Sequence, residues 1–320
     1  MNLNNLPTRV KLVDVGPRDG LQNEKQAVPA EVKLGLIQRL QGAGLKEIEV
    51  TSFVSPKWVP QMADNVDVMR GIGRFRREGG GAAGQANRVR YSVLTPNMKG
   101  FEAAIAAPRD EWPDEIVVFG AASEAFSQRN INCSIAESIE RFAPVVAAAR
   151  AQGIYVRGAM SCTVGCPYEG EIDPSRVDLL AGLMKGIGVQ HIGVADTIGV
   201  GTPVKVQRAL EATLKHYDID DISGHYHDTY GQALANTLAS MALGVWQFDT
   251  SSAGLGGCPY AKGATGNVAT EDVVYMLQGM GIDTGIDLDL LIDAGVYISH
   301  ALGREPNSLA SKAIRAKRAA

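Results

Sequence analysis

The sequence predicts an α/β protein that folds as a (β/α)8 TIM barrel with appended C-terminal helices. Two observations predict this class. Short β-branched runs alternate roughly eight times with helical patterns rich in Ala, Leu, Glu, Lys and Arg. Polar residues that could act in catalysis or metal binding follow these runs, and active sites of such barrels lie at the carboxyl ends of their strands. An open, doubly wound sheet is the alternative, because the choice depends on counting weak strands.

The predicted strands are rich in β-branched and aromatic residues, and they lie at residues 10–15, 47–53, 91–95, 115–119, 155–160, 191–194, 221–225 and 245–249. The predicted helices between them lie at residues 29–41, 134–152, 174–185, 203–216, 232–243 and 270–278. The first helix has Pro29 at its start and Gly42 and Gly44 beyond its end, as helix termini prefer.

Two stretches depart from this alternation. Residues 71–90 are basic and glycine-rich, which predicts a solvated flexible loop. A phosphate-binding role there is the weaker alternative, because the Lys-Ser/Thr ending of a P-loop is missing. Apolar residues at helical spacing recur beyond residue 288. We therefore predict a barrel domain over residues 1–285 and a helical extension over residues 286–320 that packs on it.

Composition excludes several classes of protein. The 320 residues are 45% hydrophobic and 21% charged, which excludes a disordered chain, a collagen and a coiled coil. A net charge of -4 argues against nucleic-acid binding, and no apolar run approaches the roughly 20 residues that span a bilayer. The four cysteines are too few for a disulfide scaffold. With no targeting pattern in the first ten residues, we expect a cytoplasmic protein.

A His-x-His motif is the first candidate site. His225 and His227 are two residues apart on a predicted strand, so both point to the same side and could bind one metal ion. A hydrogen-bonded structural pair is the alternative. Asp19 and Asn267 could complete a mixed nitrogen and oxygen set, which suits Mg²⁺ or Mn²⁺ better than zinc. Both could instead be ordinary turn residues, since each adjoins a glycine.

Two further features carry potential chemistry. Residues 254–267 hold five glycines and Cys258, which suggests a lid whose thiol acts as an acid, base or nucleophile. An inert cysteine in a flexible connection is the alternative. Arg18 could stabilise an enolate or bind a carboxylate, or form a salt bridge to Glu49 or Asp14. We interpret Cys162 and Cys166 as structural and Cys133 as an apolar filler.

These motifs resemble hydroxymethylglutaryl-CoA lyase, a family of metal-dependent barrel lyases with a DRE-type motif. That motif stands here as Arg18-Asp19-Gly20. The resemblance runs from about residue 10 to residue 302, and the glycine- and cysteine-containing loop is its most specific part. Other matching segments read VGPRDGLQNEKQ at 15–26, TSFVSPKWVPQM at 51–62, SCTVGCPYEG at 161–170 and HYHDTYGQALAN at 225–236.

The resemblance implies a reversed Claisen reaction that cleaves hydroxymethylglutaryl-CoA to acetyl-CoA and acetoacetate. It implies that Mg²⁺ or Mn²⁺ is held by Asp19, His225, His227 and Asn267. Asp19, or a neighbour at the metal such as His225, would take the hydroxyl proton. Arg18 would stabilise the enolate, and Cys258 would protonate it.

The resemblance also implies supporting roles. Glu49 and Asp196 would orient Arg18 and the metal ligands. Arg18, Gln22, Ser52 and Ser161 would contact the substrate, an acyl-CoA thioester, although the last three could simply close turns and strand ends. Tyr226 stands where relatives often have Cys, and strand alternation predicts that it points away from the metal. A homodimer is expected from the resemblance.

The sequence leaves three other functions open. A lyase for a longer-branched 3-hydroxyglutaryl-CoA, such as the isohexenyl compound, is the closest, because sequence does not size the pocket around the C3 substituent. A condensing synthase of the same barrel class is less favoured, because such enzymes usually carry a regulatory extension. The third alternative is a non-catalytic metal-storage barrel. In such a protein Arg18 and Cys258 would have no catalytic role, and their presence with the metal ligands would be a coincidence.

Overall fold

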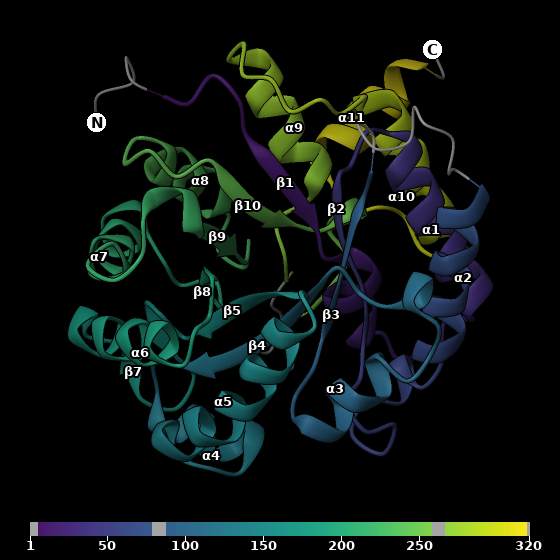
Figure 1. The fold of residues 1–320 in the computed structure, drawn as a ribbon. Coiled ribbons are helices and arrows are strands. Elements are labelled where there is room, and N and C mark those ends of the chain that lie inside the picture. The colour runs from purple at the N-terminus through teal and green to yellow at the C-terminus, as the bar shows by residue number, and fades with distance from the viewer. Residues whose placement is uncertain (1–5, 79–87, 258–265, 319–320) are drawn as a thin grey trace.

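The computed structural model describes residues 6–78, 88–257 and 266–318. Its centre is a closed barrel of parallel strands in the order β1-β10-β9-β8-β5-β4-β3-β2 (Figure 1). The strands are β1 (Lys11–Asp14), β2 (Glu47–Ser52), β3 (Arg90–Leu94), β4 (Glu115–Ala121), β5 (Tyr155–Ser161), β8 (His191–Asp196), β9 (Ile222–Tyr226) and β10 (Gln247–Thr250). The predicted barrel is confirmed, and β10 pairs with β1 to close it.

Helices cover the outside of the barrel (Figure 1). They are α1 (Ala30–Gly42), α2 (Asn65–Glu78), α3 (Met98–Ala104), α4 (Glu124–Ile131), α5 (Ile135–Ala151), α6 (Pro174–Gly186), α7 (Pro203–Thr213), α8 (Ala233–Met241) and α9 (Thr270–Gly279). Local sequence sets their starts: Ser134 and Glu137 form a capping box at α5, and Pro174 and Pro203 occupy first helical positions.

The prediction of a flexible loop at residues 71–90 is wrong for its first part, because α2 continues to Glu78. The glycines there allow close packing. A Cβ at Gly71 would lie 2.4 Å from the methyl groups of Leu34, and one at Gly73 would lie 2.6 Å from Cγ of Glu111. The Arg76 side chain is largely shielded from solvent, and its Nη2 donates to Oδ2 of Asp114 at 2.6 Å. Residues 79–87 lie outside the described part of the chain.

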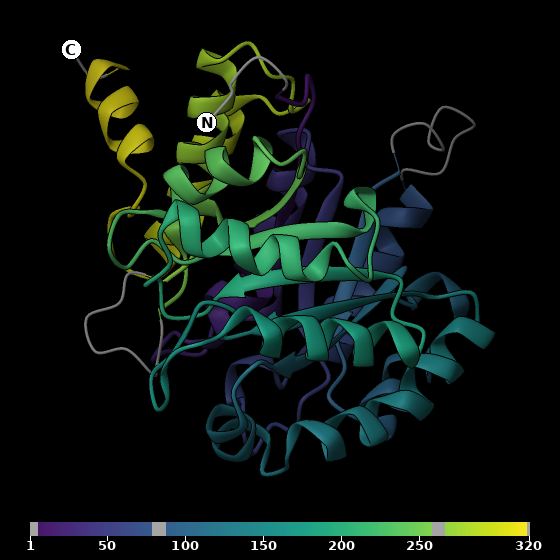
Figure 2. The same cartoon turned by 90° about the vertical axis from the view of Figure 1, so that its left-hand side faces the viewer.

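Two helices follow the barrel, α10 (Leu288–Ala301) and α11 (Leu309–Arg318). Helix α10 packs against α1, and α11 packs against α9 at the edge of the molecule (Figure 2). The guanidinium of Arg39 on α1 lies 3.8 Å from the centre of the Tyr297 ring on α10. The helical extension is thus present as two helices, and its treatment as a separate domain stays a prediction.

The carboxyl ends of the strands carry short irregular elements that position the site. A five-residue π-helix, Gly16–Gly20, follows β1 directly. A hairpin of β6 (Gly165–Cys166) and β7 (Gly170–Glu171) follows β5, and it is absent from the strands predicted from sequence. None of the described helices is long and apolar enough to cross a lipid bilayer.

Candidate active site and metal centre

Three predicted ligands converge at the carboxyl end of the barrel. Asp19 lies on the π-helix after β1, His225 lies in β9, and His227 follows β9 by one residue. One ligand atom from each residue lies within 4.8 Å of the others, and no second such group occurs among the described residues. The two imidazole rings are 5.5 Å apart at their centres. This geometry could hold a single cation between them.

Asn267 lies against this group. It forms an isolated β-bridge with His227, and its Nδ2 donates to Oδ2 of Asp19 at 2.7 Å. Rotation of the amide would present its oxygen in place of the nitrogen. The structure therefore brings all four predicted ligands together.

The chemistry of the donors fits a divalent cation. Nδ1 of His227 is buried and has no hydrogen-bond partner in the structure. Burial, reinforced by the neighbouring His225, lowers the pKa of His227 to about 4, so the ring is a neutral donor at physiological pH. Burial acts to raise the pKa of Asp19, but Arg18 and the two histidines outweigh it, and the net pKa is lowered. An anionic carboxylate beside a neutral, unpartnered imidazole suits a metal ion.

His225 is fixed from behind by Asp249. The Nδ1 atom of His225 lies 3.2 Å from Oδ2 of Asp249, which leaves the other ring nitrogen free to face Asp19 and His227. Burial acts to lower the pKa of His225, and the hydrogen bond to Asp249 outweighs it, so the net pKa is raised. A carboxylate behind a histidine is a common way to set the orientation of a metal-binding ring.

Arg18 adjoins the metal group and is itself held on two sides. Its Nε donates to Oε1 of Glu49 at 2.7 Å, and its Nη1 donates to Oδ1 of Asp19 at 2.6 Å. Gln22 adds a bond from Nε2 to the same oxygen of Asp19, at 3.2 Å. Burial acts to lower the pKa of Arg18, but the carboxylates of Glu49 and Asp19 raise it overall. A permanent cation therefore lies within the candidate site.

The local sequence explains the tight turn that carries Arg18 and Asp19. The backbone N–H groups of Arg18, Asp19 and Gly20 all donate to the carbonyl of Val15. A Cβ at Gly16 would lie 2.8 Å from Oδ1 of Asp14, and one at Gly20 would lie 2.6 Å from Cβ of Leu255. Only glycine fits at these two positions, because larger residues would push the π-helix off its neighbours.

Asp14 connects this turn to the chain on either side of residues 254–267. Its carboxylate accepts hydrogen bonds from the N–H groups of Gly16 and Ser252, both at 2.9 Å, and from Thr270 Oγ1 at 2.8 Å. Burial raises the pKa of Asp14 to about 6. One buried carboxyl thus joins the end of β1 to the segment that leads into residues 254–267.

A buried arginine in the barrel interior, Arg157, contacts the carboxylates that hold Arg18 and His225. The sequence does not predict it as a site residue. Arg157 on β5 donates to Asp249 at 2.6 Å, lies 3.1 Å from Glu115 and 3.5 Å from the second oxygen of Glu49. Glu49 holds Arg18, and Asp249 holds His225. The sequence signal for this residue is a charged side chain in the middle of an apolar strand. Arg157 precedes Ser161 by four residues, so the two side chains point to the same face of the strand.

The remaining predicted residues have distinct surroundings. Asp196 is fully buried and accepts from the N–H groups of Val200 and Gly201, so it closes the turn after β8, and burial raises its pKa to about 6. Ser52 is also fully buried, and its Oγ accepts from the N–H of Val54. The structure therefore favours for Ser52 the strand-end role that the sequence left as an alternative. Ser161, at the end of β5, is half-buried.

Tyr226 points away from the metal group, as strand alternation predicts, since its hydroxyl lies 2.7 Å from Ser240 Oγ on α8. Cys133, Cys162 and Cys166 are buried, and none belongs to the metal-ligand group found among the described residues. Cys258 lies outside the described residues.

A closed parallel barrel with a cation and a histidine-carboxylate group at its carboxyl end defines a (β/α)8-barrel enzyme with a candidate metal centre. The HMGL-like family model matches residues 9–298. The chain belongs to this family, and within it to the hydroxymethylglutaryl-CoA lyases.

Relatives and structures agree with that assignment. The mitochondrial hydroxymethylglutaryl-CoA lyase of Bos taurus is 53% identical over 307 residues, which cover 96% of this chain and 90% of the relative. The 3-hydroxy-3-isohexenylglutaryl-CoA/hydroxy-methylglutaryl-CoA lyase of Pseudomonas aeruginosa is 53% identical over 313 residues, 98% of this chain and 99% of the relative. The crystal structure of hydroxymethylglutaryl-CoA lyase from the same species matches with a TM-score of 0.90 at 52% identity, covering 98% and 99% of the two chains.

Proposed function

We propose that this enzyme cleaves hydroxymethylglutaryl-CoA to acetyl-CoA and acetoacetate with the help of a divalent cation. The observation that carries the proposal is that Asp19 contacts both parts of the site. Its carboxylate lies within 4.8 Å of a ring nitrogen of His225 and of His227, and it accepts a hydrogen bond from the Arg18 guanidinium. A cleavage that leaves an enolate needs positive charge at the hydroxyl end and at the thioester end of the substrate. The names of the relatives support the choice of substrate.

Asp19, His225, His227 and Asn267 would hold the cation. Their nitrogen and oxygen donors, with no thiolate among them, favour Mg²⁺ or Mn²⁺ over zinc. When bound, the cation supplies positive charge that lowers the pKa of the substrate hydroxyl.

The side chains of the protein perform the proton transfers in this proposal. Asp19, or His225 beside it, accepts the proton of the C3 hydroxyl as the C2–C3 bond breaks. The bonding electrons move to the thioester and form the enolate of acetyl-CoA, while C3 becomes the ketone of acetoacetate. Arg18 donates a hydrogen bond to the enolate oxygen, and Cys258 delivers a proton to C2. One proton is thus removed and one is returned.

Other residues hold these groups in place. Glu49 fixes the guanidinium of Arg18 by its 2.7 Å bond to Nε. Asp196 shapes the turn after β8 beside His225. Gln22 and Ser161 are half-buried, and we propose that they contact the substrate with Arg18.

A lyase acting on the isohexenyl-branched thioester is the second candidate. One observation favours it: the name of the Pseudomonas aeruginosa relative covers both substrates. The same site chemistry serves both compounds, since they differ only in the C3 substituent. We therefore expect the two thioesters to differ in turnover and to show the same dependence on the cation.

The test is to strip the protein of metal, add hydroxymethylglutaryl-CoA and follow acetoacetate release with and without Mg²⁺ or Mn²⁺. Cation-dependent release supports the proposal. A parallel assay with the isohexenyl thioester ranks the two substrates by kcat/KM. If neither thioester is cleaved with either cation, the lyase proposal is wrong and a condensing synthase becomes the better hypothesis.

The oligomeric state and the cellular location are also proposals. We expect a homodimer, and gel filtration with light scattering would show a mass of twice 34.0 kDa. We expect a cytoplasmic location, and fractionation of the source cells would show the protein with soluble cytoplasmic markers.

A further inference from the structure

A hollow lies at the opposite end of the barrel from the candidate active site. Its volume is about 620 Å³, and its lining comes from the starts of β3, β4, β5 and β8 and the end of α5. A neighbouring hollow of about 420 Å³ shares Arg150, Tyr155 and Gln190 with it and adds Lys185 and Asp221. The two form one trough across the amino-terminal ends of the strands.

Cations outnumber carboxylates along this trough. Arg88, Arg90, Arg150 and Lys185 line it, against Asp114 and Asp221. This is the reverse of the chain as a whole, whose net charge is -4. The trough is therefore a local concentration of positive charge that the overall composition does not predict.

The carboxylate of Asp114 is already shared. It accepts from Arg88 at 2.5 Å, from Arg76 at 2.6 Å and from the N–H of Tyr91 at 3.0 Å. Arg76 does not line the hollow, yet it balances the charge of Asp114. Arg90 forms ion pairs with Glu115 at 3.6 Å and Glu47 at 3.7 Å, but Arg157 and Lys11 contact the same two carboxylates more closely, at 3.1 and 3.0 Å. Positive charge on this side of the trough is thus incompletely paired.

The other side of the trough holds Arg150 and Lys185. Neither forms an ion pair with any residue that the structure describes, and the ammonium of Lys185 lies 4.5 Å from the centre of the Tyr217 ring. A Cβ at Gly188 would lie 2.6 Å from Nη1 of Arg150, so this glycine makes room for the guanidinium. Both cations lie in the last turn of a helix, where they offset the partial negative charge of the carbonyls. Arg90 begins β3 and Arg88 precedes it by two residues, so neither has such a role.

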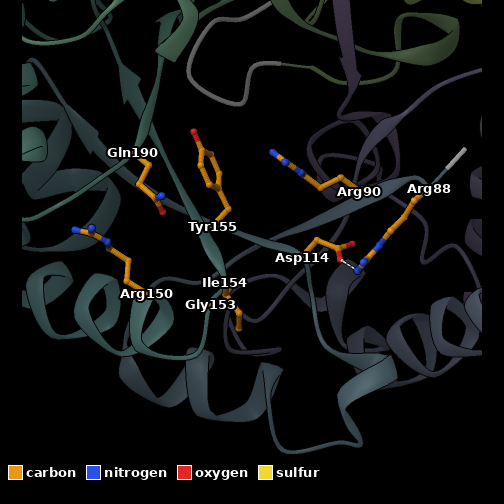
Figure 3. Close-up of a pocket in the computed structure, with 8 residues that line it drawn as sticks. All are labelled: Arg88, Arg90, Asp114, Arg150, Gly153, Ile154, Tyr155 and Gln190. Carbon is orange, nitrogen blue, oxygen red and sulfur yellow. Dashed lines mark hydrogen bonds and ion pairs between the residues drawn. The ribbon is translucent and has the colours of Figure 1, made fainter. Parts of the chain in front are cut away.

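Two neutral side chains, Tyr155 and Gln190, also line the trough. Figure 3 shows Tyr155 between Arg150 and Gln190 on one side and Arg88 and Arg90 on the other. Burial raises the pKa of Tyr155 to about 12, so its hydroxyl keeps its proton at physiological pH. Oε1 of Gln190 accepts from the N–H of Val156 at 3.2 Å, which leaves the NH₂ group available for a ligand.

We propose that this trough binds a small molecule with two phosphate groups at its two ends. One phosphate contacts Arg88 and Arg90, the other contacts Arg150 and Lys185, and the middle of the ligand lies over Tyr155 and Gln190. Guanidinium groups bind phosphate oxygens in pairs, and four cations match two dianionic groups. The ligand leaves the carboxyl end of the barrel open, so it does not compete with the acyl-CoA substrate.

The test is isothermal titration calorimetry of the metal-loaded enzyme, with fructose 1,6-bisphosphate as the probe and glucose 6-phosphate as the single-phosphate comparison. We expect one saturable site for the bisphosphate, with affinity at least about tenfold above that of the monophosphate. Binding should weaken as NaCl rises from about 50 to about 300 mM, because exposed charges are screened. The absence of saturable binding at millimolar probe, or equal affinity for both sugars, would overturn the proposal.

Variants locate the binding to this trough. Arg150→Gln combined with Lys185→Gln should lower affinity for the bisphosphate by at least about tenfold, since one phosphate loses both cations. Lyase turnover should match that of the parent enzyme, because both residues lie at the opposite end of the barrel from the candidate active site. The unfolding temperature should fall only slightly, since the two charges are lost from the last turns of α5 and α6. Arg208→Gln, on an exposed part of α7, is the matched control and should leave affinity unchanged. An equal loss in both variants, or in neither, would place the binding elsewhere.

Discussion

Arg157 donates from Nη1 to Oδ1 of Asp249 at 2.6 Å, although 92 residues separate them in the chain. The same arginine lies 3.5 Å from Glu49, which holds Arg18, while Asp249 holds His225. One buried cation therefore connects the two arms of the candidate site through their supporting carboxylates. Charges buried in this way are tolerated only while they stay paired, because each has lost its hydration.

Replacement of this arginine tests that connection. Arg157→Met leaves three carboxylates, Glu49, Glu115 and Asp249, without their shared partner. We expect the free energy of unfolding to fall by about 3–5 kcal/mol in urea titrations, and lyase turnover to fall with it.

The matched control for Arg157 is an arginine in an exposed ion pair. Arg77 pairs with Asp110 on the surface, and Arg77→Met should cost at most about 1 kcal/mol. A loss for Arg157→Met no larger than that of the control would mean that the buried network contributes little to stability.

Metal binding should depend on His227 and not on its neighbour Tyr226. His227→Ala removes a buried nitrogen that has no other partner, and we expect the affinity for Mn²⁺ to fall at least about tenfold in equilibrium titrations. Tyr226→Phe removes only the hydroxyl that contacts Ser240, so Mn²⁺ affinity should stay the same while stability falls by about 1 kcal/mol. Equal affinities in the two variants would exclude His227 as a ligand.

The oxyanion role of Arg18 predicts a change in turnover more than in substrate affinity. Arg18→Met should lower kcat by about 10²–10³-fold, because a donor aimed at the enolate oxygen is lost. Steady-state kinetics with hydroxymethylglutaryl-CoA would measure this. A fall of less than about tenfold would assign Arg18 to a structural role, as the partner of Glu49 and Asp19.

Cys258 has a separate prediction, which rests on the family resemblance and on its place in residues 254–267. Cys258→Ala should leave binding of the thioester near normal in titrations while turnover collapses, because C2 would lack its proton donor. Cys133→Ala, at a buried thiol in the connection between α4 and α5, is the comparison and should keep turnover. Unchanged turnover in Cys258→Ala would remove this thiol from the acid role.

The sequence predicted the barrel and its metal group because both depend on local patterns. The alternation of strands and helices sets the fold class, and period-two geometry places His225 and His227 on one side and Tyr226 on the other. The family resemblance then supplied the roles of Asp19 and Asn267.

The parts that the sequence missed depend on contacts between distant elements. Arg157 is an ordinary charged residue until β2, β4 and β10 bring Glu49, Glu115 and Asp249 around it. The helical part of residues 71–90 was missed for a related reason. Glycine usually signals flexibility, but Gly71 and Gly73 are required by the close approach of Leu34 and Glu111.

Glu271 predicts how stability depends on pH. Its carboxyl is fully buried, both oxygens accept from the N–H of Ala253, at 2.9 and 3.0 Å, and burial raises its pKa to about 8 from the ordinary value of 4.5. Between these two values the folded protein keeps a proton that the unfolded chain releases. The contribution of Glu271 to stability is therefore complete below pH 4.5 and is lost as the pH rises through 8.

Glu271→Gln imitates the protonated acid and should remove this loss. Urea titrations at pH 6 and pH 9 should show a smaller fall in unfolding free energy for the variant than for the parent, by up to a few kcal/mol, since each pKa unit corresponds to about 1.4 kcal/mol. Glu211→Gln, at an exposed position on α7, serves as the control and should follow the parent. If Glu271→Gln loses as much stability between the two pH values as the parent does, the buried carboxyl is not protonated in the folded enzyme, and the fall must come from other groups such as Glu115, whose pKa is raised to about 7.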